Sequence, residues 1–123
     1  MILEELDIYK LSRELSKLVW LTYKDLEWQI KKTMGDQWLS CTDSVGANIA
    51  EGFGRYHYLD KNKFNYNSRG SLLEVRHWTE LLFERGFIKE DDYKEIYKIV
   101  EKLHLKLNNY INSTRNQNMN ISN

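Results

Sequence analysis

Apolar residues recur at intervals of three and four along four segments of the 123-residue chain. This spacing places them on one face of an α-helix, which turns once in about 3.6 residues. The segments are residues 5–28, 36–53 and 60–85, and a fourth that opens at Glu90. Their apolar faces comprise Ile8, Leu11, Leu15, Leu18 and Thr22; Trp38, Thr42, Val45 and Ile49; Phe64, Ser68, Ser71, Val75, Trp78 and Leu82; and Tyr93, Ile96, Val100, Leu103, Leu107 and Tyr110.

Glycines mark the ends of these segments. Gly35-Asp36 is expected to break the chain after the first helix, with Asp36 as the N-cap of the second. Gly52 and Gly54 are expected to end the second helix, and Gly86 the third. The connections are short and the chain has no proline. The sequence therefore predicts an all-α fold, an antiparallel up-down-up-down four-helix bundle.

The bundle is expected to comprise residues 1–112. Residues 113–123 are polar and lack the helical repeat, so we expect them to form a disordered tail. A chain of this length supports one domain.

Composition narrows the possible partners. Eighteen basic and eighteen acidic residues give a formal net charge of zero, so only local basic patches argue for nucleic acid. The lone Cys41 has no internal disulfide partner, which is typical of a reducing compartment. The acidic N-terminus lacks a long apolar run, which argues against a signal peptide or a membrane span. We expect a cytoplasmic protein.

Small and polar residues are concentrated in two stretches, residues 44–55 and 69–74. In the second and third helices, Ser68, Gly70 and Ser71 are expected to face Ala47 and Ala50, which would allow the two helices to approach closely. Glycine inside a helix costs about 1 kcal/mol relative to alanine, so close approach would compensate for it. On this interpretation Gly70→Leu disrupts folding or assembly, and Glu51 and Arg69 are candidates to meet across the contact.

The pattern Glu-x-x-His occurs twice, at Glu74–His77 and Glu101–His104. Together with Glu14 and Glu51, these residues would match the ligand set of a dimetal carboxylate bundle. The helical phase turns Glu101 and His77 outward, which favours two unrelated pairs on solvated faces. Cys41 has no nearby histidine, and Gly52-Phe53-Gly54-Arg55 lacks the lysine of a phosphate loop. We therefore expect no catalytic residue, metal or cofactor.

Four lysines, Lys94, Lys98, Lys102 and Lys106, follow one another at intervals of four on the last helix. Such a row either binds phosphates or forms a solvated face balanced by Glu95 and Glu101. The candidate nucleic-acid-binding residues are these four lysines, with Arg55 and Arg76 as weaker candidates.

Aromatic residues are dense near the connection between the second and third helices. They are Phe53, Tyr56, Tyr58, Phe64 and Tyr66. Exposed, they would form the kind of apolar patch that signals association, so we expect a homo-oligomer. A second group, Trp78, Phe83, Phe87, Tyr93 and Tyr97, fits core and subunit contacts better than base stacking.

The stretch Ser44-Val45-Gly46-Ala47-Asn48-Ile49-Ala50-Glu51-Gly52-Phe53-Gly54-Arg55, followed by Arg69-Gly70-Ser71-Leu72-Leu73-Glu74, resembles the signature of the four-helix-bundle proteins encoded in 23S rRNA intervening sequences, the S23 proteins. Gln37, Phe64 and Gly86-Phe87-Ile88 match as well. The signature residues are Asn48, Ala50, Glu51, Gly52, Arg69, Gly70, Ser71 and Glu74. Leu39-Ser40, in place of an expected basic pair, and Gly46, in place of a frequent proline, depart from the pattern.

The resemblance implies a ring-like homopentamer without enzymatic activity. It also implies a fold shared with the accessory protein of diversity-generating retroelements, which binds a reverse transcriptase and nucleic acid. We therefore expect a non-enzymatic homo-oligomer that binds RNA, DNA or a nucleic-acid-handling protein. The alternative is a protein-only assembly module that docks a reverse transcriptase, and the remote alternative is a dimetal enzyme.

Overall fold

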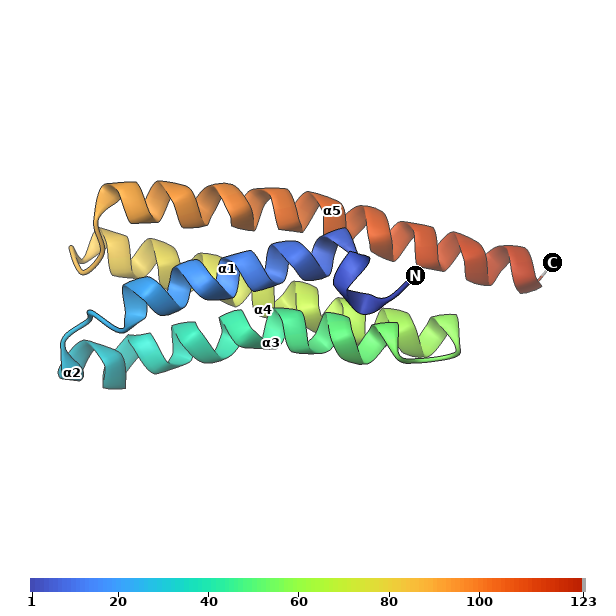
Figure 1. Cartoon of the computed structure of the whole chain (residues 1–123), viewed down its shortest axis with the longest axis horizontal. Helices are drawn as coiled ribbons and strands as arrows, with labels where there is room; N and C mark the ends of the chain where they lie inside the picture. Colours follow the sequence, from blue (N-terminus) through green and yellow to red (C-terminus); the bar gives the residue numbers. More distant parts are fainter. Residues whose placement is uncertain (123) are drawn as a thin grey trace.

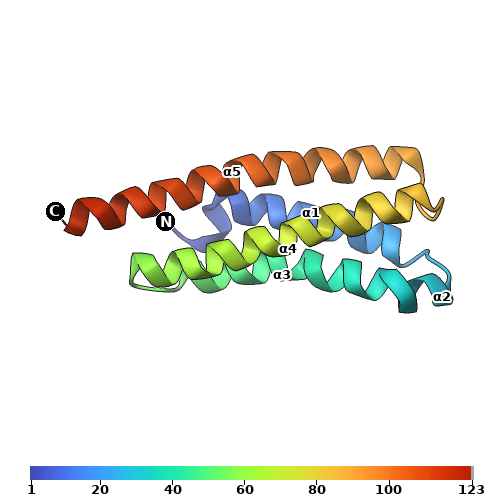
Figure 2. The same cartoon turned by 180° about the vertical axis from the view of Figure 1, so that it is seen from behind.

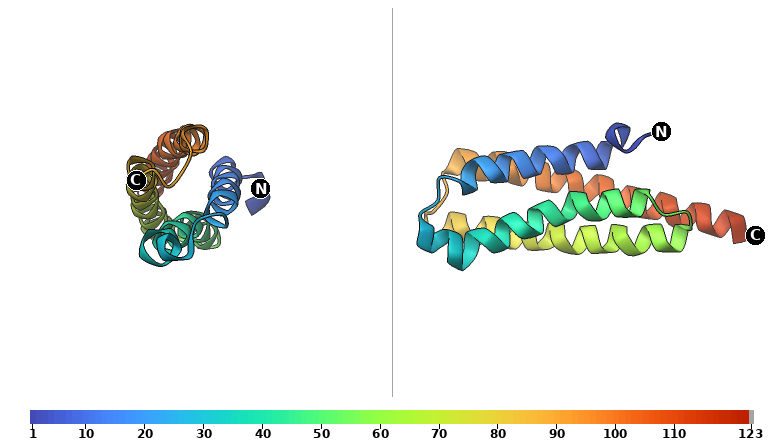
Figure 3. Two further views of the ribbon diagram at one scale, coloured as in Figure 1. Left: turned by 90° about the vertical axis from the view of Figure 1, so that its left-hand side faces the viewer. Right: turned by 60° about the horizontal axis from the view of Figure 1, so that its bottom comes forward.

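Helices account for nearly all of the structure. The computed structural model describes the backbone of residues 1–122 and the side chains of residues 1–117. The elements are η1 (Leu3–Glu5), α1 (Asp7–Tyr23), α2 (Trp28–Ile30), the π-helical turn η2 (Lys31–Gly35), α3 (Asp36–Phe53), α4 (Tyr58–Glu84) and α5 (Glu90–Ser122). The long helices α1, α3, α4 and α5 run antiparallel to their neighbours (Figures 1 and 2). Seen end on, they surround a shared core in that order (Figure 3), which confirms the all-α, four-helix prediction.

The core is formed by the apolar face of each long helix. Leu15, Trp38, Val45, Val75 and Leu103 are completely buried. On α4 the buried face differs in part from the predicted one. The residues that are buried on α4 are Asn62, Asn65, Ser68, Leu72, Val75, Thr79 and Leu82. Phe64, Ser71 and Trp78 are only half-buried, because the inward line runs from Ser68 to Leu72 and not to Ser71.

The break between the first two long helices differs from the prediction. α1 ends at Tyr23, and the chain is helical again from Trp28 to Phe53, so Gly35 lies inside a continuous helical run with a φ of −61°. The side chain of Asp36 does not cap the helix; it accepts a hydrogen bond of 2.5 Å from the Tyr23 hydroxyl. Gly35 lies close to the end of α1: a Cβ there would lie 3.2 Å from side-chain atoms of Tyr23 and Leu26, which would have to shift by a few tenths of an ångström.

The end of α4 agrees with the prediction. Gly86 has a φ of 78°, the left-handed conformation in which glycine is favoured. Its N–H donates to the Phe83 carbonyl at 3.0 Å, and the Phe87 N–H donates to the Leu82 carbonyl at 2.9 Å. This pair of bonds is a Schellman motif, which satisfies carbonyls that the end of a helix leaves free.

The last helix is longer than expected. Residues 113–122 continue α5, where we expected a disordered tail; residue 123 lies outside the described residues. Thr114 is buried and donates to the Tyr110 carbonyl at 2.9 Å. Arg115 donates to the Tyr66 hydroxyl at 2.7 Å. Contacts with α4 therefore extend the bundle beyond residue 112, and no glycine or proline follows to stop the helix.

Buried polar contacts fix α3 against α4. The Trp38 indole N–H donates to the Thr79 hydroxyl at 2.9 Å, and the Ser68 hydroxyl donates to the Val45 carbonyl at 2.9 Å. Each bond joins residues distant in sequence and lies inside the core. They set which residues of the two antiparallel helices lie at the same height.

Candidate functional site

The lysine row of α5 lies on the surface. Lys94, Lys98 and Lys102 are exposed and Lys106 is half-buried. Lys94 pairs with Glu90 at 3.3 Å, and Lys106 with Asp7 of α1 at 3.6 Å. Within the described part of the chain, Lys98 and Lys102 have no acidic partner within ion-pair distance. The middle of the row is therefore its most available part.

The two weaker basic candidates are already engaged. Arg55 pairs with Glu51 at 2.9 Å, and Arg76 forms an ion pair with Glu101. The Arg76 guanidinium also lies over the Tyr97 ring at 5.2 Å. Because a carboxylate already neutralises each arginine, neither adds much free positive charge to the lysine row.

Arg69 does not contact Glu51, which corrects the pairing considered from the sequence. Its guanidinium donates to the Asn108 side-chain oxygen of α5 at 3.0 Å and lies 5.2 Å from the centre of the Tyr66 ring. Arg69 points toward α5, whereas Glu51 is exposed and bonded to Arg55 on its own helix. Arg69 therefore joins α4 to α5.

His104 lies half-buried on α5, the helix that Arg69 contacts. Burial lowers the pKa of His104, and the positive charges of Arg76 and Arg69 lower it further. A histidine with a pKa below its usual range is neutral at physiological pH. His104 therefore adds no charge to the basic surface there.

The glycines of the signature have different roles from those expected. A Cβ on Gly46 would lie 2.8 Å from the Ser12 hydroxyl oxygen, so Gly46 lets α1 approach α3. A Cβ on Gly52 would lie 3.1 Å from the Lys61 carbonyl oxygen and from the Phe64 Cβ, so Gly52 lets α4 approach. A Cβ on Gly70 would meet nothing within 4 Å, and Gly70 is exposed. The predicted packing of Gly70 against α3 is therefore wrong.

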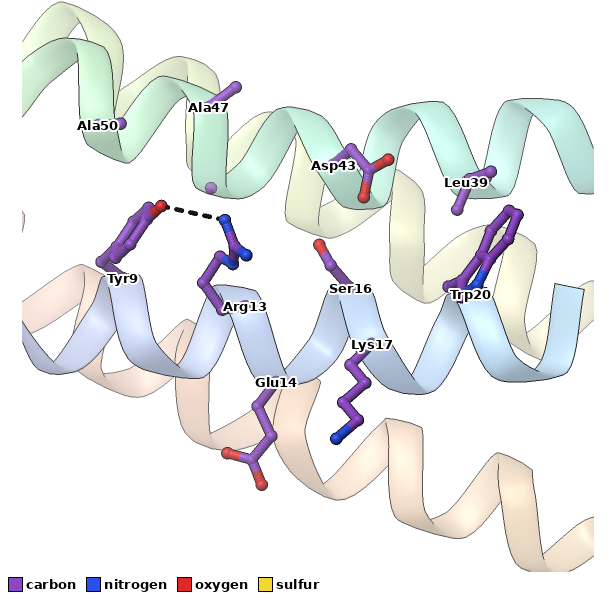
Figure 4. Close-up of a pocket in the computed structure, with 11 residues that line it drawn as sticks. Tyr9, Arg13, Glu14, Ser16, Lys17, Trp20, Leu39, Asp43, Ala47 and Ala50 are labelled. Atoms are coloured by element: carbon purple, nitrogen blue, oxygen red, sulfur yellow. Dashed lines mark hydrogen bonds between the residues drawn. The ribbon is translucent and has the colours of Figure 1, made fainter. Parts of the chain in front are cut away.

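The remaining signature residues lie at the surface or in half-buried positions. Asn48 is half-buried, and its side-chain N–H donates to the Ser44 carbonyl at 2.9 Å. Ser71 is half-buried, and Glu74 is exposed. Ala47 is exposed and Ala50 is half-buried, and both line a groove between α1 and α3; the Ala47 side chain points away from α1 (Figure 4).

An open groove of about 790 Å³ runs between α1 and α3. We call it the α1–α3 groove. It is lined by Tyr9, Arg13, Glu14, Ser16, Lys17, Trp20, Leu39, Asp43, Gly46, Ala47 and Ala50. In Figure 4, Trp20 stands against Leu39 at one end and Tyr9 lies below Ala50 at the other, while Glu14 and Lys17 point away from α3. Arg13 donates to the Tyr9 hydroxyl at 3.3 Å.

Sequence reasoning missed the α1 side of this groove. The apolar stripe identifies only the inward face of α1, and Tyr9, Arg13 and Trp20 lie beside that stripe. One signal was available: Trp20 is a large aromatic residue outside the repeat, and it is 50% exposed.

The candidate metal ligands are not brought together. Within the described residues, no group of three or more His, Cys, Asp or Glu side chains lies close enough to hold a metal ion. Glu101 is engaged by Arg76, and His77 is exposed. Burial raises the pKa of Cys41 to about 12, so its thiol stays protonated and is a poor nucleophile.

The two aromatic groups differ in exposure. Phe83 stacks on Tyr93 across α4 and α5 at 4.1 Å between ring centres, and Tyr97 lies 5.6 Å from Tyr93. Near the α3–α4 connection, Tyr56 is 89% exposed and Tyr66 is 39% exposed. Phe83 and Tyr93 therefore pack against the core, whereas Tyr56 and Tyr66, near the α3–α4 connection, are available for association.

A helix that crosses a bilayer must be both long and apolar. In the described part of the chain, none combines the length and the hydropathy that crossing a bilayer requires.

Fold and signature together define a four-helix bundle protein of the S23 type. The family model of the 23S rRNA-intervening sequence proteins matches residues 4–109. The chain therefore belongs to that family, as the sequence signature indicated. No protein with a curated description matches the chain.

A solved structure supports the same fold. The crystal structure of a protein of unknown function from the S23 ribosomal protein family of Bacteroides thetaiotaomicron VPI-5482 is similar, with a TM-score of 0.76 and 22% sequence identity. The match covers 85% of this chain and 97% of that chain.

Proposed function

We propose that the protein is a non-enzymatic, homo-oligomeric bundle that binds RNA through the lysine row of α5. The observation that carries this proposal is the exposed pair Lys98 and Lys102, which have no ion-pair partner in the described part of the chain. Unpaired lysines at helical spacing suit a phosphate backbone, because phosphate binding releases condensed counterions. Membership of a family described by 23S rRNA intervening sequences makes RNA the first nucleic acid to test.

The experiment compares two double variants. Lys98→Gln with Lys102→Gln removes the centre of the row, and Lys10→Gln with Lys24→Gln removes two exposed lysines of the α1 region. Binding of a fluorescein-labelled RNA hairpin is followed by anisotropy over a series of salt concentrations. The α5 variant is expected to bind roughly tenfold more weakly at low salt, a loss of about 1.4 kcal/mol. Its salt slope should fall by about one for each lysine removed.

The control variant should keep the wild-type affinity and slope. Equal losses in both variants would mean that only total charge matters and would contradict the α5 assignment. Wild-type protein that does not bind RNA at low salt would contradict the proposed function itself.

The second candidate is a protein-only assembly module that docks a partner such as a reverse transcriptase. Two observations favour it: the net charge of zero and the open α1–α3 groove. A reverse transcriptase co-purified with the tagged protein after nuclease treatment would support this candidate. If nuclease treatment instead removes the reverse transcriptase from the tagged protein, the result would support the RNA-binding proposal.

A further inference from the structure

Two arginines approach the same tyrosine where α4 and α5 lie side by side (Figure 2). The Arg115 guanidinium donates to the Tyr66 hydroxyl at 2.7 Å, and the Arg69 guanidinium carbon lies 5.2 Å from the centre of the Tyr66 ring. Arg69 also donates to the Asn108 side-chain oxygen at 3.0 Å. We call these four residues the arginine site. It holds two like charges beside one ring, so a negatively charged ligand would relieve their repulsion.

Neither charge of the arginine site is neutralised by a carboxylate. Among the side chains that the structure describes, no Asp or Glu lies within ion-pair distance of Arg69 or Arg115. The groups that hold the two arginines are an amide and a phenol, which are uncharged. A guanidinium has five N–H donors, and the described part of the chain accepts a hydrogen bond from one donor of each arginine. Arg115 is exposed and Arg69 is half-buried, so the other donors can reach a ligand that arrives from solvent.

The segments that carry the arginine site are basic, although the net charge of the chain is zero. Residues 61–73 and 102–123 contain no Asp or Glu, and their basic residues are Lys61, Lys63, Arg69, Lys102, Lys106 and Arg115. Because α4 and α5 are antiparallel, these segments lie at the same end of the bundle (Figure 2). Apart from Asp60 in the first turn of α4, the acidic residues of the two helices lie between residues 74 and 101.

The acidic side chains that α1 brings to this end of the bundle lie on another side of α5. Glu5 and Asp7 line a pocket with Lys106, Asn109 and Tyr110, where the chain around the start of α1 approaches α5. Asp7 also pairs with Lys106. The arginine site lies where α5 meets α4. These carboxylates therefore leave its charge unpaired.

The arginine site also continues the lysine row of α5. Asn108 follows Lys102 by six residues, which is about 9 Å along the helix axis. Arg115 follows Asn108 by roughly two turns, on the same side of α5. A helix with its side chains is about 10–12 Å across. An RNA strand that lies on Lys98 and Lys102 can therefore cross the outer face of α5 and reach the arginine site.

We propose that Arg69 and Arg115 together bind one phosphate group. A planar guanidinium matches two oxygens of a phosphate, and such charge-assisted hydrogen bonds are stronger than neutral ones. Tyr66 and Asn108 position the two arginines, so less side-chain entropy is lost on binding. The inference deepens the proposed function and rests on it for the source of the phosphate, an RNA strand held by the lysine row. A free phosphate ion has the same chemistry.

The first part of the test compares two single variants in RNA binding. Arg115→Gln removes one charge of the site. Arg13→Gln is its matched control, because Arg13 is also exposed and also donates to a tyrosine hydroxyl, that of Tyr9 on α1. Anisotropy of the fluorescein-labelled RNA hairpin is followed over a series of salt concentrations. Arg115→Gln is expected to bind roughly fivefold more weakly at low salt, with a salt slope lower by about one, and Arg13→Gln should match the wild type.

Arg69→Gln should weaken RNA binding in the same way. Arg69 also joins α4 to α5, so circular dichroism first checks that this variant is folded. If it is not, Arg115→Gln decides the test alone, since Arg115 is exposed near the end of the last helix.

The second part of the test uses inorganic phosphate as the ligand. Signals of the arginine Nε–H groups are recorded by NMR on the ¹⁵N-labelled protein and assigned with the three arginine variants. Phosphate should shift the signals of Arg69 and Arg115 and leave that of Arg13 in place. Sodium acetate at the same ionic strength is the control and should shift none of them.

The two parts separate a failure of the site from a failure of the proposed function. RNA affinity that Arg115→Gln leaves unchanged, together with signals that phosphate does not move, would overturn the site; weaker binding by the Lys98→Gln, Lys102→Gln protein would then leave the proposed function standing. A wild-type protein that binds no RNA contradicts the proposed function, and the phosphate titration then decides the site by itself.

The source of the phosphate is decided by the same data. Shifts with inorganic phosphate but unchanged RNA affinity in Arg115→Gln would support the site with free phosphate as its ligand and would contradict the path from the lysine row. Equal shifts with phosphate and acetate would show a general effect of anions and overturn the phosphate assignment.

Discussion

At the scale of single residues, the glycines of the signature separate into two kinds. Gly46 and Gly52 lie where a Cβ would approach another helix closely, whereas Gly70 lies in open space. The sequence marks all of them as unusual in a helix, but it does not say what each one faces. That depends on which side of the helix meets a neighbour.

Gly46→Ala should destabilise the protein by about 1–3 kcal/mol, because the new Cβ would lie 2.8 Å from the Ser12 hydroxyl oxygen. Adding Ser12→Ala should recover most of the loss, since the Ser12 Cβ would be 3.4 Å away. Urea unfolding at one fixed protein concentration measures these changes. Gly54→Ala, where the nearest atom is 3.7 Å away, is the control and should change stability little. Equal effects at positions 46 and 54 would contradict the close contact.

The Tyr23–Asp36 hydrogen bond makes stability depend on pH. This bond lowers the pKa of the Asp36 carboxyl, with a smaller contribution from Lys32. A carboxyl with a lowered folded pKa adds stability above its unfolded pKa of about 3.9, and this stability is lost as the pH falls through the folded value. The stability difference between wild type and Tyr23→Phe should therefore be largest near neutral pH and shrink below about pH 4.

Unfolding curves over an acid pH series check this expectation. In an Asp36→Asn background, Tyr23→Phe should show no such acid dependence. The difference in the free energy of unfolding between wild type and Tyr23→Phe could instead stay constant down to strong acid. That result would mean that the bond does not favour the ionised form of Asp36.

At the scale of helices, polar contacts decide how the amphipathic faces align. The apolar stripe of α4 permits more than one rotation, and the Trp38–Thr79 and Ser68–Val45 bonds select one of them. The same bonds turn Gly70 outward. The sequence located the end of α3, both ends of α4 and the start of α5 closely, because glycines and polar residues interrupt the repeat there. It misplaced the end of α1, since the break at residues 24–27 contains no glycine.

Thr79→Val should destabilise the bundle by about 1–3 kcal/mol, because it leaves the buried Trp38 indole N–H without an acceptor. Thr42→Val is the matched control. It removes an equally buried hydroxyl that donates to the Trp38 carbonyl, so no donor is orphaned and the loss should be smaller. Urea unfolding distinguishes the two variants. A larger loss for Thr42→Val would show that the indole bond is not what Thr79 contributes.

At the scale of the whole molecule, function is expected to reside on surfaces that the core does not use. The outer face of α5 carries lysines, and the α1–α3 groove is lined by charged, small and aromatic residues. Net charge is zero overall, so the lysine row is a local feature on a balanced surface. In the proposed homo-oligomer, several such rows would act on one RNA, and their combined affinity would exceed that of a single row.

The sequence by itself determined that this chain forms four helices and belongs to its family. Helix formation follows from a local repeat, and the signature is a local string of residues. The lysine row was also visible, because residues four apart on one helix are neighbours. Only the tertiary structure decided that Arg69 joins Asn108, that Gly46 meets Ser12, and that Gly70 meets nothing. These contacts join residues on different helices, and their geometry depends on how the helices rotate and align when the core packs.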